Sequence, residues 1–347
     1  MALLEFTDKG IFCPTARVYL DPWRPVERAL ITHGHSDHAR AGHRHYLATA
    51  AAAPIIRHRL GADVETIAFG EKLTINGVEF SFHPAGHIMG SAQIRVAYKG
   101  EVWVFTGDYK TEPDGLTETF ESVRCSTMIT ECTFGLPVFN WRPQTEVLEE
   151  INDWWRTNKA IGKASVIGAY SLGKAQRVLA GVDPSIGPIF THGAVEGTNE
   201  VLRAQGIKLP DTTYITADIP RSSFAGSLVI APPSALGSSW MRRIGPASTG
   251  VASGWMALRG VRRRRAVDRG FVLSDHVDWQ QLNDAVKASD AERVYVTHGY
   301  TSVFRRWLET QGYDARIAQT DYEGEALDES TKENAEADVT AEGGATS

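Results

Sequence analysis

The chain has 347 residues, of which 42% are hydrophobic and 22% are charged. This length favours one large domain with an insertion, or two domains, over a single small domain. No apolar run approaches the roughly 18 to 20 residues of a membrane-spanning helix, and no secretory signal pattern is visible at the start. The three cysteines have neither metal-knuckle nor redox spacing, which argues against a disulfide scaffold. We therefore expect a cytoplasmic protein with no membrane partner.

The formal net charge of −6 arises mainly at the C-terminal end. Residues 323–347 contain eight acidic residues, one lysine and almost no large apolar side chain, so we predict a disordered acidic tail there. The rest of the chain has 34 acidic and 35 basic residues. A nearly neutral body can bind nucleic acid where its cations cluster, and six arginines gather between Arg259 and Arg269. A solvated basic face is the alternative interpretation.

Residues 1–134 are rich in β-strand signals. Short apolar runs separated by turns predict strands over 29–32, 78–82, 92–98 and 102–105. The turn between the last two runs predicts a hairpin.

The pattern changes between residues 135 and 268. Helices and strands are predicted to alternate there, the helices over 146–158, over 174–181 and from about residue 197, the strands over 165–169 and 227–231. This alternation predicts an inserted α/β unit with a parallel sheet. Strand signals resume over 271–274 and 293–297, so we expect residues 269–322 to complete the first domain.

The strongest chemical signal is the run His33-Gly34-His35-Ser36-Asp37-His38, which directly follows an apolar strand signal. Imidazole nitrogens and a carboxylate suit Zn²⁺ or a similar divalent ion. Four ligands so close in sequence do not fit one tetrahedral ion, because neighbouring side chains on an extended segment point to opposite sides. We therefore predict two ions at this turn, with a purely structural role as the alternative. Three later strand signals each end in a further candidate beside a glycine: His87, Asp108 and His298.

With these residues the sequence resembles the metallo-β-lactamase superfamily. Its motifs are a strand aspartate, the His-x-His-x-Asp-His run, a later histidine, a later aspartate and a final histidine. Asp21 matches the first motif, which in the family orients the metal loop. The resemblance implies an α/β chain folded as an αββα sandwich with two divalent ions. From the ligand types, which also suit Fe, we expect Zn²⁺ in preference to Mn²⁺. The resemblance assigns His33, His35 and His87 to one ion, Asp37, His38 and His298 to the other, and Asp108 to both.

The long insertion resembles that of the β-CASP nucleases, a branch of this superfamily. Three motifs of the branch match Thr130-Glu131-Cys132-Thr133, Ser274-Asp275-His276 and His298-Gly299. The resemblance covers residues from about 1 to 320. It implies a metallo-β-lactamase domain in two parts, 1–134 and 269–322, around an inserted α/β β-CASP domain at 135–268. The arginine-rich segment 253–276 is most similar to the bacterial ligase-associated DNA exonucleases, which are encoded beside an ATP-dependent DNA ligase and a helicase.

Phosphodiester hydrolysis needs an activated water, charge stabilisation and a proton for the leaving oxygen. Two ions held by residues such as Asp37 and Asp108 would meet the first two needs, with Asp108 also helping to position the water. We predict that His276 donates the proton and that Glu131 orients its ring and raises its pKa. The alternatives are a structural histidine at 276, and a helix cap or salt-bridge partner at 131.

Candidates for substrate contact lie in the insertion and at its end. Ser171, Lys174 and Arg177 occupy a predicted strand-to-helix junction, where backbone N–H groups can hold a phosphate. Ser234 lies in a similar loop, and Ser274 belongs to the Ser-x-His motif. Structural and functional roles weigh equally for the loop residues.

Our leading interpretation is a metal-dependent DNA exonuclease that acts in repair, from 5′ to 3′ by analogy, in functional association with a DNA ligase and a helicase. DNA is favoured over RNA as the partner. An RNA-processing β-CASP nuclease is the alternative, because a histidine in the last motif is typical of RNA-cutting members. A small-molecule metallohydrolase is disfavoured by the length of the insertion. A non-catalytic scaffold is disfavoured because all seven ligand positions are filled.

Overall fold

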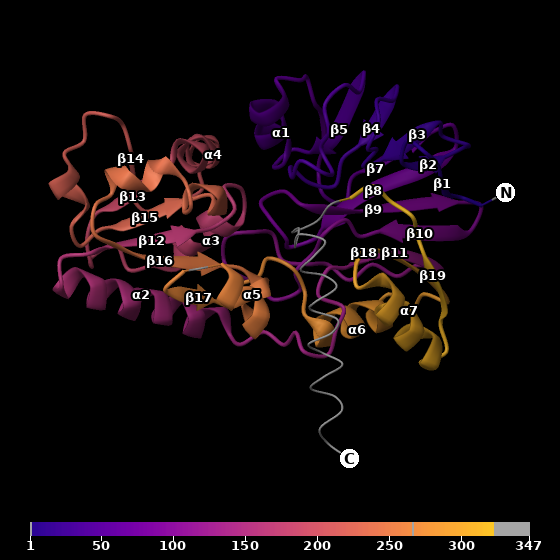
Figure 1. Ribbon diagram of the computed structural model, residues 1–347. Coiled ribbons are helices and arrows are strands. Elements are labelled where there is room, and N and C mark those ends of the chain that lie inside the picture. Colours follow the sequence, from indigo (N-terminus) through magenta and orange to yellow (C-terminus); the bar gives the residue numbers. More distant parts are fainter. Residues whose placement is uncertain (1, 266, 323–347) are drawn as a thin grey trace, which may run out of the picture. The chain divides into compact units, whose positions relative to one another are not determined.

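The computed structural model describes residues 2–265 and 267–322. They form two units, which Figure 1 shows in the colours of the sequence. Unit 1 contains residues 2–140 and 276–322, and unit 2 contains the described part of 141–275. The predicted acidic tail at 323–347 lies outside the described residues. In the described part of the chain, no helix is long and apolar enough to cross a membrane.

The first sheet of unit 1 has six strands that follow one another in chain order. They are β1 (Glu5–Phe6), β2 (Ile11–Cys13), β3 (Val18–Leu20), β4 (Arg28–Leu30), β5 (His45–Thr49) and β6 (Glu65–Ile67). The first three pair antiparallel, and β3 to β6 pair parallel. Helix α1 (Ala53–Leu60) connects β5 to β6 and ends at Gly61, whose left-handed conformation terminates the helix.

The second sheet of unit 1 has seven strands in the order β19-β18-β11-β10-β9-β8-β7. They are β7 (Lys72–Ile75), β8 (Val78–Pro84), β9 (Ala92–Tyr98), β10 (Glu101–Phe105), β11 (Thr127–Cys132), β18 (Arg293–Gly299) and β19 (Asp314–Ile317). The predicted hairpin is confirmed, because β9 and β10 pair antiparallel with Tyr98 opposite Glu101. Its two turn residues, Lys99 and Gly100, both have positive φ, as a tight two-residue turn requires.

Unit 1 has four layers. Apolar side chains of both sheets share one core, to which Leu20 and Leu30 of the first sheet and Phe80 and Ile94 of the second belong. Helix α1 packs on the other face of the first sheet, and helices α6 (Trp279–Ala288) and α7 (Thr301–Thr310) pack on the other face of the second. The order is therefore helix, sheet, sheet, helix (Figure 1). This arrangement belongs to the mixed α/β class predicted from the sequence.

Unit 2 contains a six-stranded sheet in the order β14-β13-β15-β12-β16-β17. Its strands are β12 (Ala164–Gly168), β13 (Ile189–Thr191), β14 (Thr213–Tyr214), β15 (Leu228–Ala231), β16 (Ala247–Ala252) and β17 (Arg269–Phe271). Its helices are α2 (Gln144–Ala160), α3 (Lys174–Gly181), α4 (Gly193–Ala204) and α5 (Arg259–Arg264), with short 3-10 turns at Arg221–Phe224, Pro233–Ala235, Ser239–Arg243 and Gly254–Ala257. Every strand pairing is parallel, as predicted for the insertion.

The strand near residue 271 corrects one prediction. We expected it to continue the first domain, but Arg269, Gly270 and Phe271 pair with β16 in the sheet of unit 2. Burial of Phe271 in the core of unit 2 explains this, and the division falls after residue 275 instead of 268. At the other end, the division falls after residue 140 instead of 134. There Phe139 packs on Phe134 at 4.9 Å between ring centroids, and its carbonyl accepts a hydrogen bond from Trp279 N–H.

Helix α4 also begins earlier than predicted, at Gly193 instead of about residue 197. The preceding His192 accepts a hydrogen bond from Ala194 N–H through Nδ1, at 3.1 Å. An imidazole thus takes the place of the usual serine, threonine or aspartate cap, which the sequence pattern did not indicate.

Candidate metal centre

A buried aspartate fixes the loop that follows β4. Asp21 accepts hydrogen bonds from Thr32 N–H at 2.7 Å and from the Thr32 hydroxyl, and its carboxylate lies 2.7 Å from His38 Nδ1. Because Asp21 engages Nδ1 of His38, the other ring nitrogen, Nε2, faces the remaining candidate ligands. This geometry is consistent with the orienting role predicted for Asp21, which stays a prediction.

A glycine brings the end of β10 against this loop. Gly107 has a φ of 55°, and a Cβ atom there would lie 2.7 Å from the Thr32 hydroxyl oxygen. Any side chain at 107 would therefore collide with Thr32 and would also strain the backbone. The next residue, Asp108, is 2% exposed and projects between two groups of histidines.

The first group consists of His33, His35, His87 and Asp108, whose candidate ligand atoms all lie within 4.8 Å of one another. His35 Nδ1 and His87 Nε2 are 3.0 Å apart. Asp108 Oδ2 lies 3.6 Å from His33 Nε2 and 3.8 Å from His87 Nε2. Ligands about 2 Å from a shared ion are separated by about 3 to 3.5 Å, so these spacings fit one divalent ion.

The second group consists of His38, Asp108 and His298, with Asp37 beside it. The other oxygen of Asp108, Oδ1, lies 3.5 Å from His38 Nε2 and 2.9 Å from His298 Nε2. Asp37 Oδ2 lies 3.7 Å from His38 Nε2. The structure thus brings together all seven residues predicted as metal ligands, and each oxygen of Asp108 faces a different group.

Unsatisfied polar atoms test whether metal ions fit here. His33 Nε2 and His38 Nε2 are buried and form no hydrogen bond with any described residue, whereas the buried atoms Asp108 Oδ1 and His298 Nε2 lie 2.9 Å from each other. A buried polar atom without a partner costs about 1 to 3 kcal/mol, so the two histidine nitrogens call for an additional binding partner. Imidazole nitrogens and carboxylate oxygens are the donor set of Zn²⁺ and related ions, and the residues present therefore fit two such ions.

The electrostatics of the two groups agree with this fit. Burial lowers the pKa of His33 well below 6.5, which keeps its imidazole in the neutral form that binds metal. Burial would also lower the pKa of His38, but the charges of Asp108, Asp37 and Asp21 outweigh it and raise that pKa to about 10. The carboxylates around His38 therefore favour a positive charge, which a divalent cation would supply.

His276 and Glu131 form a second arrangement beside Asp108. Nδ1 of His276 lies 2.9 Å from both carboxylate oxygens of Glu131. Glu131 also accepts hydrogen bonds from Tyr109 N–H and from the Thr133 hydroxyl, and both Glu131 and His276 are about 1% exposed. Candidate ligand atoms of Asp108, Glu131 and His276 lie within 4.8 Å of one another. The fixed carboxylate therefore sets the orientation of the His276 ring.

Tyr322 is a part of this site that our sequence analysis missed. Its ring stacks on that of His38, with centroids 4.5 Å apart and planes inclined by 9°, and its hydroxyl donates a hydrogen bond to the Asp21 carbonyl at 3.0 Å. It follows β19 and lies 301 positions from Asp21 in the chain. The only sequence signal is a large aromatic residue just before a segment that lacks them, which is too weak to assign a contact.

We expect Tyr322→Ala to weaken metal binding by roughly 10- to 100-fold, because His38 would lose the ring that holds it in place. Tyr322→Phe keeps the stacked ring and should stay within a few-fold of the wild type. Competition with a chromogenic chelator measures both affinities. Wild-type affinity in the alanine variant would show that Tyr322 does not position His38.

The predicted substrate residues lie in unit 2. Lys174 is fully buried, with Nζ 2.9 Å from Asp275 Oδ1, and Arg177 is 2% exposed and donates to the Ser274 carbonyl at 3.3 Å. Ser171 is half-buried beside Gly173, Ser274 is buried, and Ser234 is exposed in its 3-10 turn. Burial of both cations within a hydrogen-bonded network adds a structural role for them, and their role in substrate binding stays a prediction.

Comparison with known proteins gives three informative similarities, although no family model matches the sequence. A "Probable DNA ligase" of Opitutus terrae is 34% identical over 313 residues, which are 88% of this chain and 30% of that protein. An "Endoribonuclease YSH1" of Eremothecium gossypii is 28% identical over 122 residues, 35% of this chain and 16% of that protein. The "Cleavage and polyadenylation specificity factor subunit 3-I" of Arabidopsis thaliana is 31% identical over 122 residues, 35% of this chain and 17% of that protein. The chain thus covers less than a third of the length of each relative.

A solved structure shares the fold. A protein of unknown function from Enterococcus faecalis matches with a TM-score of 0.57 and 10% identity, over 85% of this chain and 80% of that one. At this level of identity the likeness concerns the fold alone. The nuclease names among the sequence relatives are consistent with the hydrolytic enzyme predicted from the sequence.

Proposed function

We propose that this chain is a β-CASP nuclease of the metallo-β-lactamase superfamily that hydrolyses phosphodiester bonds in DNA with two divalent metal ions. The observation that carries the proposal is the pair of ligand groups that share Asp108. Similarity to proteins named endoribonuclease and DNA ligase supports a nucleic-acid substrate. The layers of unit 1 and the parallel sheet of unit 2 are in line with the two domains that the resemblance implies.

The seven ligand residues would hold the ions, and Zn²⁺ is the ion we favour over Mn²⁺ because five of the seven are histidines. Two bound divalent ions supply a nucleophile at neutral pH and stabilise negative charge on the phosphoryl oxygens. The chain itself must then provide a proton for the leaving oxygen. His276 suits this role, because the carboxylate of Glu131 holds Nδ1 and so makes Nε2 the nitrogen that would donate the proton.

Two features support DNA as the substrate. The relative named DNA ligase aligns over 88% of this chain, whereas the endoribonuclease of Eremothecium gossypii aligns over 35%. The arginines of segment 253–276 supply positive charge, and this segment is the one that resembles the ligase-associated exonucleases. We propose 5′-to-3′ exonuclease action in DNA repair, together with a DNA ligase and a helicase, and a cytoplasmic location.

RNA cleavage is the second candidate, and a specific observation favours it. His298 lies 2.9 Å from Asp108, where it completes the second ligand group. A histidine in this motif is typical of RNA-cutting members of the branch, and several relatives are named endoribonuclease.

Matched single-stranded DNA and RNA, each labelled at the 5′ or the 3′ end, distinguish these candidates. With metal-loaded protein we expect the DNA to shorten progressively, with early release of the 5′ label as a mononucleotide and a ladder from the 3′-labelled strand. Asp37→Ala should remove this activity, because it deletes a ligand of the second group.

Cleavage of RNA alone would favour the second candidate. Inertness of the metal-loaded protein toward both polymers would overturn the nuclease proposal and would favour the hydrolysis of small esters instead.

Asp278→Asn is a matched control, because Asp278 caps α6 through Gln281 N–H and asparagine caps a helix equally well.

A further inference from the structure

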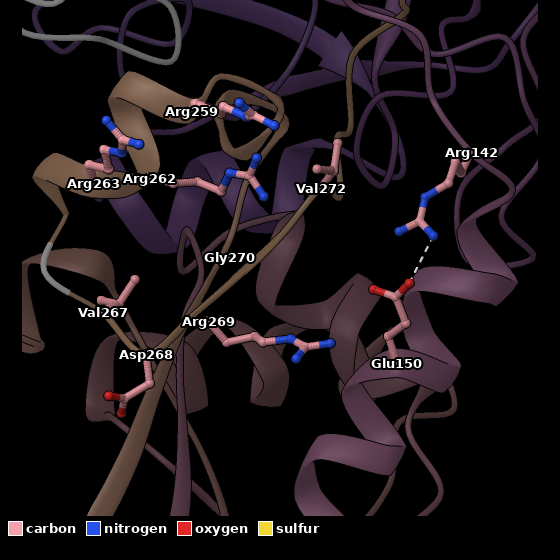
Figure 2. A pocket seen from close by; sticks show the side chains of 10 residues that line it. All are labelled: Arg142, Glu150, Arg259, Arg262, Arg263, Val267, Asp268, Arg269, Gly270 and Val272. Carbon is pink, nitrogen blue, oxygen red and sulfur yellow. Dashed lines mark hydrogen bonds and ion pairs between the residues drawn. The ribbon is translucent and has the colours of Figure 1, made fainter.

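Unit 2 contains a pocket of about 600 Å³ whose lining is rich in arginine. Five of the ten lining residues are arginines: Arg142, Arg259, Arg262, Arg263 and Arg269. They come from three separate stretches of the chain, just before α2, along α5 and at β17 (Figure 2). All of the lining residues lie between positions 142 and 272, so none of them is a candidate metal ligand.

The carboxylates of the pocket are already engaged. Glu150 lies 2.8 Å from Arg142, and Arg269 extends toward it in Figure 2. The hydrogen bond and charge of Arg142, together with the charge of Arg269, lower the pKa of Glu150 despite partial burial. The other carboxylate, Asp268, accepts hydrogen bonds from Thr249 N–H at 2.8 Å and from the Ser248 hydroxyl at 3.2 Å.

Three arginines of α5 have no counter-ion among the residues that the structure describes. Across residues 2–265 and 267–322, no carboxylate lies within ion-pair distance of Arg259, Arg262 or Arg263. All three side chains are exposed. With five guanidinium groups and two carboxylates, the pocket has an excess of three positive charges.

The missing side chain at Gly270 leaves room for the aliphatic part of Arg262. A Cβ atom at Gly270 would lie 3.1 Å from Arg262 Cδ and 3.0 Å from the sulfur of Met256, which is 1% exposed. The side chain of Arg262 therefore packs against the backbone of β17 at Gly270, beside the buried Met256. An arginine supported along its stem loses less conformational entropy when its guanidinium binds a ligand.

We propose that this pocket binds phosphate groups of a nucleic-acid strand. Guanidinium groups match phosphate oxygens through paired N–H donors, and several of them around one pocket favour a ligand with repeated negative charge. A small metabolite is usually enclosed over most of its surface, whereas these arginines are exposed and can reach a polymer. The proposal rests on the proposed nuclease function, for which it names a substrate-anchoring site that provides no metal ligand.

The arginine run offers a matched comparison. Arg262 and Arg263 line the pocket, whereas Arg264 and Arg265, which follow directly, do not. The double variants Arg262→Ala/Arg263→Ala and Arg264→Ala/Arg265→Ala remove the same charge from the same run of exposed residues. Binding of the full chain to a fluorescently labelled single-stranded DNA is measured by anisotropy over a series of salt concentrations, with a chelator present so that no hydrolysis occurs.

We expect the pocket variant to bind about tenfold more weakly at moderate salt, with the slope of log affinity against log salt reduced by about 1.4, or about 0.7 for each lost phosphate contact. The Arg264→Ala/Arg265→Ala variant should stay within about twofold of the wild type, with an unchanged slope. Equal losses in the two variants would show that the arginines act only as a diffuse positive field, and no loss in the pocket variant would exclude it as a binding site. Either result overturns the proposal.

Direct titration with inorganic phosphate and with a nucleoside monophosphate separates the strand from a free phosphate compound. If either one binds the wild type but not the pocket variant, while both double variants bind DNA equally, the pocket serves a free phosphate compound and the strand proposal is wrong. Because binding is measured without metal, its outcome does not depend on the nuclease assay. Unaltered DNA binding by the pocket variant of an active nuclease would overturn this inference alone.

Discussion

Replacement of Asp108 by asparagine is expected to reduce hydrolysis by about 10³-fold or more, because the metal ions that Asp108 would help to hold would contribute several kcal/mol of charge stabilisation. Each oxygen of Asp108 faces a different ligand group, at 3.6 Å from His33 and 3.5 Å from His38. Asparagine has the same shape but no charge and only one oxygen. The metal content should therefore fall from about two ions per chain to one or fewer, as measured by mass spectrometry of the metal.

Asp278→Asn provides the control for this experiment, since it makes the same chemical change at a helix cap. It should retain both ions and activity within about twofold, because asparagine and aspartate cap helices equally well. Near-ultraviolet circular dichroism tests whether each variant retains its fold. An Asp108→Asn protein that keeps two ions and most of its activity would contradict the bridging role.

His276→Ala should lower turnover by about 10²- to 10⁴-fold and leave the metal content unchanged, because a general acid contributes to the chemical step and not to metal binding. His276 is held by Glu131 through Nδ1 at 2.9 Å. Glu131→Gln, which weakens this support, should cause a smaller loss of about 10- to 100-fold. His35→Ala is the comparison for metal loss, since His35 belongs to the first ligand group.

Substrates with different leaving groups test the general-acid role of His276 more directly. A nitrophenyl phosphodiester has a leaving group that departs without a proton, whereas the alkoxide of a nucleic acid needs one. We therefore expect His276→Ala to lose much less activity on the nitrophenyl ester than on DNA. Equal losses on both substrates, or a loss of metal as large as in His35→Ala, would show that His276 is a structural or ligating residue.

The sequence indicated the residues that the structure brings together because they follow strand ends. His33 follows β4 of the first sheet, whereas His87 and Asp108 follow β8 and β10 of the second, so packing of the two sheets brings these strand ends together. The close spacing of the histidine run further favoured metal binding over a structural role. These signals are local in the sequence, so they do not depend on knowledge of the tertiary structure.

Other parts of the structure depend on contacts between distant segments. Tyr322 reaches His38 only after β19 is complete, and β17 joins the sheet of unit 2 because Phe271 packs in that core. The division of the arginine run into residues inside and outside a pocket depends on how α5 packs on β17. Periodicity and motif spacing contain no information about such pairings, which are decided by the packing of side chains in three dimensions.

Metal titration tests the central claim most directly. Chelator-treated protein receives increasing amounts of Zn²⁺, or of Mn²⁺ in a parallel series, while hydrolysis of end-labelled single-stranded DNA and bound metal are recorded together. If the two ligand groups around Asp108 form one catalytic centre, activity should be absent without metal and should reach its maximum at about two bound ions per chain. Full activity in the metal-free protein, or a maximum at a single ion, would contradict the two-metal account.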